Sequence, residues 1–171
     1  MRASGWVMGL MLALVPGLAH AGFRFQSIDG GTIALDDWKG KPVLVVNTAS
    51  LCGYAGQYDD LQAMHEAYGS ALLVLAVPSD DFSQELDDEQ AVKEYCAVNF
   101  DLTLPMTVIT PVRGSGAHPF YKWVAAQTGW SPGWNFNKVL IGPDGQIAGT
   151  WGAGASPRSA QIEGKITAML Q

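Results

Sequence analysis

The chain has 171 residues, of which 48% are apolar, 15% charged and 10% aromatic. This composition is typical of one globular domain and excludes disordered, collagen-like and coiled-coil proteins. The 10 Lys and Arg residues against 16 Asp and Glu residues give a net charge of −6, which argues against a nucleic-acid or anionic-membrane partner. Two cysteines allow at most one disulfide and no four-cysteine zinc site.

The first 21 residues have the pattern of a secretory signal peptide. Arg2 is their only charge, an apolar run covers residues 6–18, and a small-x-small cleavage pattern ends at Ala21. The run is too short for a membrane-spanning helix. We therefore expect a signal peptide over residues 1–21 and one domain over residues 22–171, periplasmic or secreted and free of the membrane after cleavage. An uncleaved N-terminal anchor is the alternative.

The N-terminal half of the domain alternates strand and helix patterns. Apolar residues that alternate on both sides of Asp29-Gly30-Gly31 predict a β-hairpin. Continuous apolar runs predict strands over residues 42–47 and 72–77, each covered on both faces. Between them, the apolar residues of 53–68 follow helical spacing and predict a helix.

The C-terminal half continues this alternation. Asp87 is predicted to cap a short helix that carries Cys96 on its apolar face and ends near Asn99. The other predicted elements are a strand over 106–109, a helix opened by Pro119, an antiparallel hairpin over 136–151 and a last helix capped by Ser156-Pro157. Together the elements predict an α/β domain with a mixed central sheet flanked by helices.

Cys52 is the first candidate for chemistry. It follows the first buried strand and comes just before the predicted helix. Backbone N–H groups and the helix dipole favour a thiolate at a helix start, and a loop position keeps the sulfur accessible. The residues alone leave two other interpretations open: a small buried apolar residue, or one half of a structural disulfide with Cys96.

Other candidate sites are weaker. The three histidines lack metal-ligand spacing, and no Gly-rich phosphate loop joins a strand to a helix. The acidic run over residues 80–89 is typical of a solvated face. Trp134-Asn135 precedes a predicted strand and offers two side-chain N–H donors, although a core Trp beside a turn Asn fits the pattern equally.

Five blocks of the sequence resemble the glutathione peroxidase family and occur in the family's order. They are Asn47-Thr48-Ala49-Ser50-Leu51-Cys52-Gly53 with Gln57-Tyr58, Leu75-Ala76-Val77-Pro78 with Phe82 and Gln84-Glu85, Leu104-Pro105-Met106, His118-Pro119-Phe120-Tyr121-Lys122, and Trp134-Asn135-Phe136-Asn137-Lys138. The resemblance covers essentially all of residues 22–171. It implies a thioredoxin-like fold and the reduction of hydrogen peroxide or organic hydroperoxides.

The resemblance also implies a role for each matching residue. Cys52 matches the peroxidatic cysteine, and Trp134 and Asn135 match the tryptophan and asparagine of the family's catalytic tetrad. Cys96 resembles the second cysteine with which members without selenium resolve the sulfenic acid. No metal or organic cofactor is implied.

Two positions depart from the family's pattern. Asp81 stands at the position of the tetrad glutamine, and Leu51 replaces the basic residue commonly found before the catalytic cysteine. Both changes remove support for a thiolate, and a carboxylate beside Cys52 would raise its pKa. We therefore expect Asp81 either to point away from Cys52 or to be replaced in function by a nearby amide, that of Gln84 or Gln57.

The sequence thus predicts a thiol peroxidase. The Cys52 thiolate attacks the distal oxygen of ROOH, Cys96 resolves the sulfenic acid, and an external dithiol reduces the disulfide. We expect a thioredoxin-like donor in preference to glutathione, because a second cysteine is present and the compartment is oxidising. We also expect the two sulfurs to lie well apart in the reduced form, with local opening of the Cys96 helix before the disulfide closes.

Two other functions are weighed against the peroxidase. Asp81 and Leu51 favour a peroxide-sensing or binding module with slow turnover. A thiol–disulfide oxidoreductase is disfavoured because residues 52–55 contain no C-x-x-C pair. The segment over 129–133 is shorter than in tetrameric relatives, so the resemblance implies a monomer.

Overall fold

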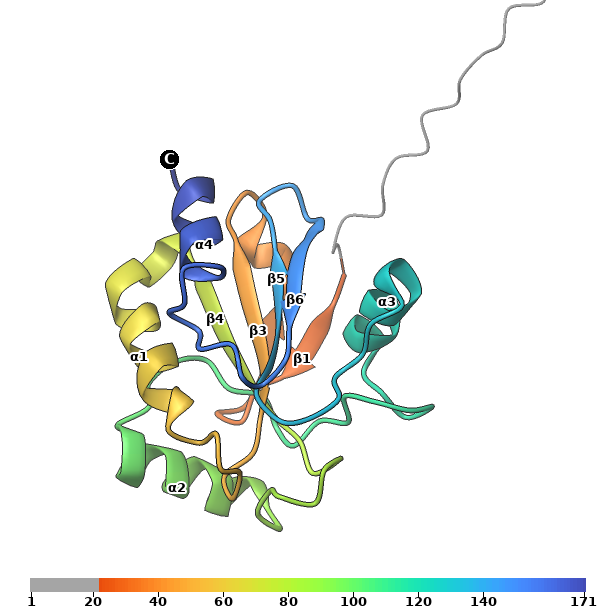
Figure 1. Cartoon of the computed structure of the whole chain (residues 1–171). Helices are drawn as coiled ribbons and strands as arrows, with labels where there is room; N and C mark the ends of the chain where they lie inside the picture. The colour runs from red at the N-terminus through yellow and green to blue at the C-terminus, as the bar shows by residue number, and fades with distance from the viewer. Residues whose placement is uncertain (1–21) are drawn as a thin grey trace, which may run out of the picture.

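The computed structural model describes residues 22–171, and the predicted signal peptide over residues 1–21 lies outside them. The elements in chain order are β1 (Arg24–Gln26), β2 (Thr32–Ala34), the 3₁₀ helix η1 (Leu35–Trp38), β3 (Val43–Thr48), α1 (Gln57–Tyr68), the 3₁₀ helix η2 (Gly69–Ala71), β4 (Leu73–Pro78), α2 (Glu89–Phe100), α3 (Pro119–Thr128), β5 (Asn137–Ile141), β6 (Ile147–Trp151) and α4 (Glu163–Met169) (Figure 1). Among these, no helix has the length and apolar character needed to span a membrane.

The central sheet has four strands in the order β4-β3-β5-β6. β3 pairs in parallel with β4 and antiparallel with β5, and β5 pairs antiparallel with β6. Every residue of β3, β4 and β5 is buried, as expected for strands that are covered on both faces. The predicted mixed sheet is confirmed, and the N-terminal hairpin is confirmed as the separate antiparallel pair β1-β2.

Two apolar clusters cover the two faces of this sheet. Along β3 the side chains alternate, so that Leu44 and Val46 belong to one cluster and Val43 and Val45 to the other. Helices α1, α2 and α4 contribute buried residues to the first cluster, whereas α3 and the hairpin contribute to the second. The sheet therefore lies between a layer of three helices and a layer made by α3 and the hairpin (Figure 1).

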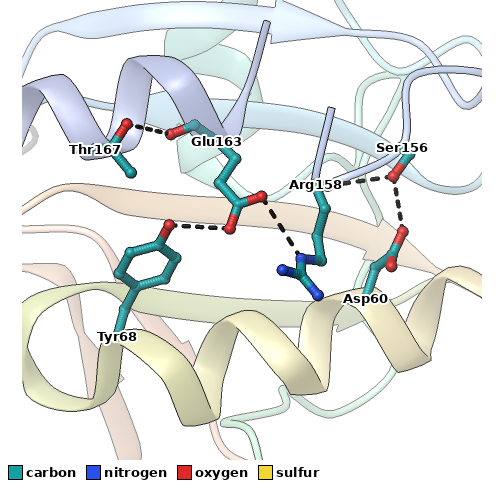
Figure 2. Close-up of polar contacts among 6 residues, drawn as sticks. All are labelled: Asp60, Tyr68, Ser156, Arg158, Glu163 and Thr167. Carbon is teal, nitrogen blue, oxygen red and sulfur yellow. Dashed lines mark hydrogen bonds and ion pairs between the residues drawn. The ribbon is translucent and has the colours of Figure 1, made fainter. Parts of the chain in front are cut away.

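Polar contacts hold the C-terminal segment against α1 (Figure 2). The Ser156 hydroxyl donates to Asp60 Oδ2 at 2.7 Å, and the Tyr68 hydroxyl donates to Glu163 Oε1 at 3.0 Å. Arg158 Nε lies 3.6 Å from Glu163 Oε2. Because the donors and acceptors come from both ends of α1, these contacts fix the helix that follows the Cys52 loop.

Two helix starts differ from the prediction. α1 begins at Gln57 rather than near Gly53, because residues 49–58 first form a series of i→i+3 hydrogen-bonded turns. α2 is capped by Asp88 and not by Asp87, since the Asp88 carboxylate accepts the N–H of Ala91 at 2.8 Å.

Two C-terminal predictions also need correction. Residues 106–109 form no strand: Met106 bridges to Ala76 and Thr107 bridges to Ser27, so the segment crosses from the sheet edge to the hairpin. α4 begins at Glu163 and not directly after the Ser156-Pro157 pair, because residues 156–162 form 3₁₀-type turns.

Candidate active site

The pairing of β3 with β5 brings two distant loops together. Asn47 near the end of β3 lies opposite Asn137 at the start of β5, and the strands run antiparallel. Residues that follow β3 and residues that precede β5 must therefore lie at the same edge of the sheet. The first group contains Cys52 and the second contains Trp134, so the register places both loops at one edge.

The Trp134-Asn135 turn is fixed by hydrogen bonds from both strands. The Asn47 side-chain amide donates to the Trp134 carbonyl at 3.0 Å, and the Asn137 side-chain amide donates to the same oxygen. Phe136 adopts a φ of 57°, and its N–H donates to the Asn47 carbonyl at 2.5 Å. A non-glycine residue in this left-handed region costs about 1 kcal/mol or more, so the surrounding bonds stabilise a specific turn.

This turn directs the two side chains differently. Asn135 is fully buried, whereas Trp134 is 43% exposed. The centres of the Trp134 and Phe82 rings lie 5.4 Å apart. The Arg113 guanidinium lies over the Phe82 ring, 4.9 Å from its centre. Trp134 is thus not a core residue, and its indole is available at the surface.

Cys52 lies in the turns that precede α1. Its side chain is only 5% exposed, and it is bracketed by Leu51 at 60% and Tyr54 at 42%. The Cys52 carbonyl accepts the N–H of Ala55 at 2.9 Å within these turns. Cys52 lies between β3 and α1, as predicted, but α1 starts five residues later, at Gln57, so the turns of residues 53–56 separate Cys52 from the first turn of the helix.

Gln84 joins the cysteine loop to the Trp-Asn turn. The N–H of Leu51 donates to the Gln84 carbonyl at 2.9 Å, and the Asn135 side-chain amide donates to Gln84 Oε1 at 3.0 Å. The other amide candidate, Gln57, is engaged elsewhere, because it donates to the Ala153 carbonyl and accepts from Lys138. Of the two amides named from the sequence, Gln84 is therefore the one beside Asn135.

Asp81 stands at the position of the family's tetrad glutamine, but its contacts in the structure indicate a different role. Its Oδ2 atom accepts the N–H of Val112 at 2.6 Å and the N–H of Arg113 at 3.0 Å. The carboxylate thus faces the 112–113 segment, which is the first of the two outcomes expected from the sequence. Asp81 anchors a loop, and the catalytic assignment that its alignment position suggested is corrected accordingly.

Replacing Asp81 with Ala is expected to destabilise the domain by about 1.5–3 kcal/mol, the usual value of hydrogen bonds to a charged group. The rate of Cys52 oxidation should change less than twofold, because the carboxylate is turned to the 112–113 segment. Urea unfolding and stopped-flow oxidation measure the two quantities. The exposed Asp87→Ala variant is the matched control, and a large rate change in Asp81→Ala at unchanged stability would contradict the structural role.

Glu85 was missed by sequence reasoning. The acidic run over residues 80–89 was expected to be solvated, yet Glu85 is buried. Its Oε1 accepts the N–H of Ser50 and the N–H of Leu86, both at 2.9 Å, and burial raises its pKa. The only sequence signal was its place beside Gln84 in one of the resembling blocks.

Cys96 is buried on α2 and lies in the same apolar cluster as Cys52. Both cysteines are free thiols in the structure. Burial raises the pKa of the Cys96 thiol to about 11; the neighbouring Tyr58 hydroxyl lowers it and the negative charge of Glu85 raises it. In the part of the chain that the structure describes, no three His, Cys, Asp or Glu side chains gather closely enough to hold a metal ion.

The mixed sheet flanked by helices, with its N-terminal hairpin, defines a protein of thioredoxin-like fold. A thioredoxin-family thiol:disulfide interchange protein from Chlorobium tepidum superposes with a TM-score of 0.67 over 90% of this chain and 96% of that chain, at 15% identity, which shows the shared fold alone. The crystal structure of the apo form of Trgpx superposes with a TM-score of 0.69 and 31% identity, over 90% of this chain and 97% of that chain.

Sequence comparison narrows this class to a family. A family model described as glutathione peroxidase matches residues 21–125. The hydroperoxy fatty acid reductase of Synechocystis sp. is 34% identical over 151 residues, which are 80% of this chain and 88% of that protein. The chain belongs to the glutathione peroxidase family, and its enzyme class is that of the peroxidase oxidoreductases.

Proposed function

We propose that Cys52 is the peroxidatic residue of a thiol peroxidase. The observation that carries the proposal is the chain of contacts from the cysteine loop through Gln84 to Asn135, next to the exposed indole of Trp134. These contacts support a site in which one nucleophile and three side-chain N–H donors lie at one edge of the sheet. Gln84 takes the part of the amide that the chain lacks at Asp81.

In the first step the Cys52 thiolate attacks the distal oxygen of ROOH. An S–O bond forms while the O–O bond breaks, which leaves Cys52–SOH and an alkoxide that takes up a proton to become ROH. N–H groups of Trp134, Gln84 and Asn135 stabilise the negative charge as it moves from sulfur to the departing oxygen. The sulfur is oxidised by two electrons and the peroxide is reduced by two.

In the second step Cys96 forms a disulfide with Cys52, after local opening of α2. This helix buries only Val92 and Cys96, and a cavity of about 90 Å³ lies beside Cys96, between Ile28, Leu102 and Met106 among other residues. Tyr95 and Phe100 of α2 are only partly buried against the same cluster, so local opening of this segment costs less than global unfolding. A thioredoxin-like dithiol then reduces the disulfide.

The surroundings of Cys52 favour organic hydroperoxides as substrates besides hydrogen peroxide. Leu51 and Tyr54, which flank the nearly covered Cys52 in sequence, are exposed, as is Trp134, and such apolar groups suit an apolar R group on ROOH. The Synechocystis relative is named a hydroperoxy fatty acid reductase. The signal-like residues 1–21 support a periplasmic or secreted protein that protects against oxidants outside the cytoplasm, and the short segment over 129–133 supports a monomer.

Stopped-flow oxidation of Cys52 by hydrogen peroxide tests this function. The wild-type rate constant is expected to exceed that of a free thiolate, because the donors stabilise the charge that leaves the sulfur. Trp134→Phe should lower it by about tenfold or more, the value of one hydrogen bond to a charged group. Tryptophan 123, on α3 and outside the site, gives the control variant Trp123→Phe, which should leave the rate constant unchanged.

A wild-type rate constant no greater than that of a free thiolate would contradict the peroxidase and favour the sensing module. Leu51 is the observation behind that second function, because it offers the thiolate no positive charge. An unchanged rate in Trp134→Phe at a fast wild-type rate would leave the peroxidase standing and remove the indole from the mechanism.

A further inference from the structure

A buried polar cluster lies beneath the cysteine loop, between β3, α1 and α2. Its members are the side chains of Thr48, Ser50, Tyr58 and Glu85, which are each at least nine-tenths buried, together with the thiol of Cys96. Tyr58 faces both the Thr48 hydroxyl and the Cys96 thiol, and the charge of Glu85 acts on both Tyr58 and Cys96. The cluster therefore connects the loop that carries Cys52 to the second cysteine.

The cluster is costly for the fold as it stands. Thr48 Oγ1, Ser50 Oγ, the Tyr58 hydroxyl and Glu85 Oε2 form no hydrogen bond of good geometry among the described residues, although Tyr58 lies close to Thr48 and Cys96, and Ser50 lies close to Glu85. A buried polar group left unpaired costs about 1–3 kcal/mol, and native proteins contain few of them. Stability does not account for a carboxylate oxygen in this place.

Glu85 is held so that one oxygen is fixed and the other is free. Oε1 accepts two backbone N–H groups, from Ser50 and Leu86, and the Glu85 N–H donates to Asp80 Oδ1 at 3.1 Å. These three bonds fix the side chain at both ends. Oε2 accepts no hydrogen bond from the described residues. The negative charge of this carboxylate raises the pKa of Cys96 on α2.

We propose that Glu85 is the proton acceptor for Cys96 when this thiol resolves the Cys52 sulfenic acid. The inference rests on the proposed function, because it assigns the proton transfers of its second step. It adds Glu85 as a catalytic residue beside the Cys-Gln-Trp-Asn set, with a role confined to disulfide closure.

The step balances as follows in atoms and charge. While α2 is still closed, Glu85 takes the proton from the Cys96 thiol, and once α2 opens the Cys96 thiolate attacks the Cys52 sulfur. An S–S bond forms as the S–O bond breaks, and hydroxide leaves and takes the proton back from the Glu85 carboxyl group to become water. One sulfenic acid and one thiol give one disulfide and one water, and Glu85 ends as the carboxylate on which it began.

The state of Cys96 explains why a base is needed. Burial raises the pKa of this thiol to about 11, so that about one molecule in 10⁴ carries the thiolate at pH 7. A thiol is a poor nucleophile compared with its thiolate. Burial also raises the pKa of Glu85, which makes it a stronger base than an ordinary carboxylate.

Other titratable groups border the pair. Tyr58 of α1 faces Cys96, Tyr95 of α2 lies within the field of both Cys96 and Glu85, and Asp80 adds a like charge near Glu85. Burial raises the pKa of Tyr58 well above its usual value, so this hydroxyl stays protonated and can donate to the thiolate that forms. Of the two groups that act on Cys96, Tyr58 and Glu85, the base at neutral pH is therefore Glu85.

Rapid mixing of the reduced protein with one equivalent of hydrogen peroxide, followed by acid quench and mass spectrometry, tests the proposal. Glu85→Gln keeps an oxygen for the Ser50 and Leu86 N–H groups but removes the base. We expect Cys52 oxidation within twofold of wild type and disulfide closure slower by about 10²-fold, the lower end for general acid–base catalysis. The exposed Asp87→Asn variant is the charge-matched control and should behave as wild type in both steps.

The pH profile separates catalysis from a structural effect. Wild-type closure should fall as the pH drops through the raised pKa of Glu85. Closure in Glu85→Gln should rise steadily toward the pKa of Cys96, which lies below the wild-type value of about 11 once the Glu85 charge is gone, and approach the wild-type rate there. Equal closure rates at pH 7, or a loss in Glu85→Gln that alkaline pH does not restore, would overturn the role of Glu85. Failure of wild-type Cys52 to be oxidised would instead overturn the proposed function.

Discussion

A serine at position 52 is expected to abolish peroxide turnover while the domain stays folded. The serine hydroxyl is not ionised at neutral pH and is a far weaker nucleophile than a thiolate, so loss of the nucleophile should reduce turnover by at least about 10⁴-fold. Cys52 is 5% exposed and packs in the cluster below the sheet, so the smaller and more polar serine should cost about 1 kcal/mol of stability. Peroxide consumption coupled to a dithiol donor measures the first quantity, and urea unfolding the second.

The control for Cys52→Ser is the wild-type protein alkylated at Cys52 after brief reduction, which blocks the same sulfur without a mutation. Both preparations should consume peroxide at the background rate. Turnover that survives in Cys52→Ser but disappears in Cys96→Ser would show that the roles of the two cysteines are exchanged. Turnover that survives in both single variants would contradict a cysteine-based reaction.

The fold was largely predictable from the sequence, because burial leaves a strong signal in strands and turns. β3 and β4 are continuous apolar runs because both faces of the sheet are covered, and Pro119 opens α3 because its missing N–H is not needed there. The start of α1 was not predictable from apolar spacing. Tyr54 fits the helical spacing but is 42% exposed, and the i→i+3 bonds before Gln57 do not change the spacing enough to be seen.

The site was predictable only in part, because its geometry depends on pairing between distant segments. Resemblance named Cys52 and Trp134, but the position of their two loops at one edge of the sheet depends on the register of Asn47 opposite Asn137, which single-sequence patterns do not contain. Glu85 and Asp81 have the same charge in the same acidic run. Asp81 accepts backbone N–H groups from residues 112–113, whereas Glu85 accepts those of Ser50 and Leu86. Only the three-dimensional structure separates their roles.

Cys96→Ser is expected to stop disulfide formation without stopping the first oxidation of Cys52. Serine cannot form a disulfide, so the sulfenic acid must wait for an external thiol instead of one on the same chain. Turnover with a dithiol donor should then fall by about tenfold or more, because a bimolecular encounter replaces a tethered one. Cys96 packs beside the Tyr58 hydroxyl, which a serine hydroxyl can hydrogen-bond, so we expect the fold to be retained.

Mass spectrometry after peroxide treatment gives the decisive difference between the two proteins. Wild type should lose two hydrogens as the disulfide forms, whereas Cys96→Ser should gain oxygen at Cys52, first as the sulfenic and then as the irreversible sulfinic acid. Both thiols are free in the structure, and α2 fully buries only one residue besides Cys96, namely Val92. If α2 opens when the disulfide forms, proteolysis near residue 98 should be faster in the oxidised wild type than in the reduced protein. If Cys96→Ser turns over normally with the dithiol donor, the external thiol attacks Cys52 directly and Cys96 has no part in the cycle.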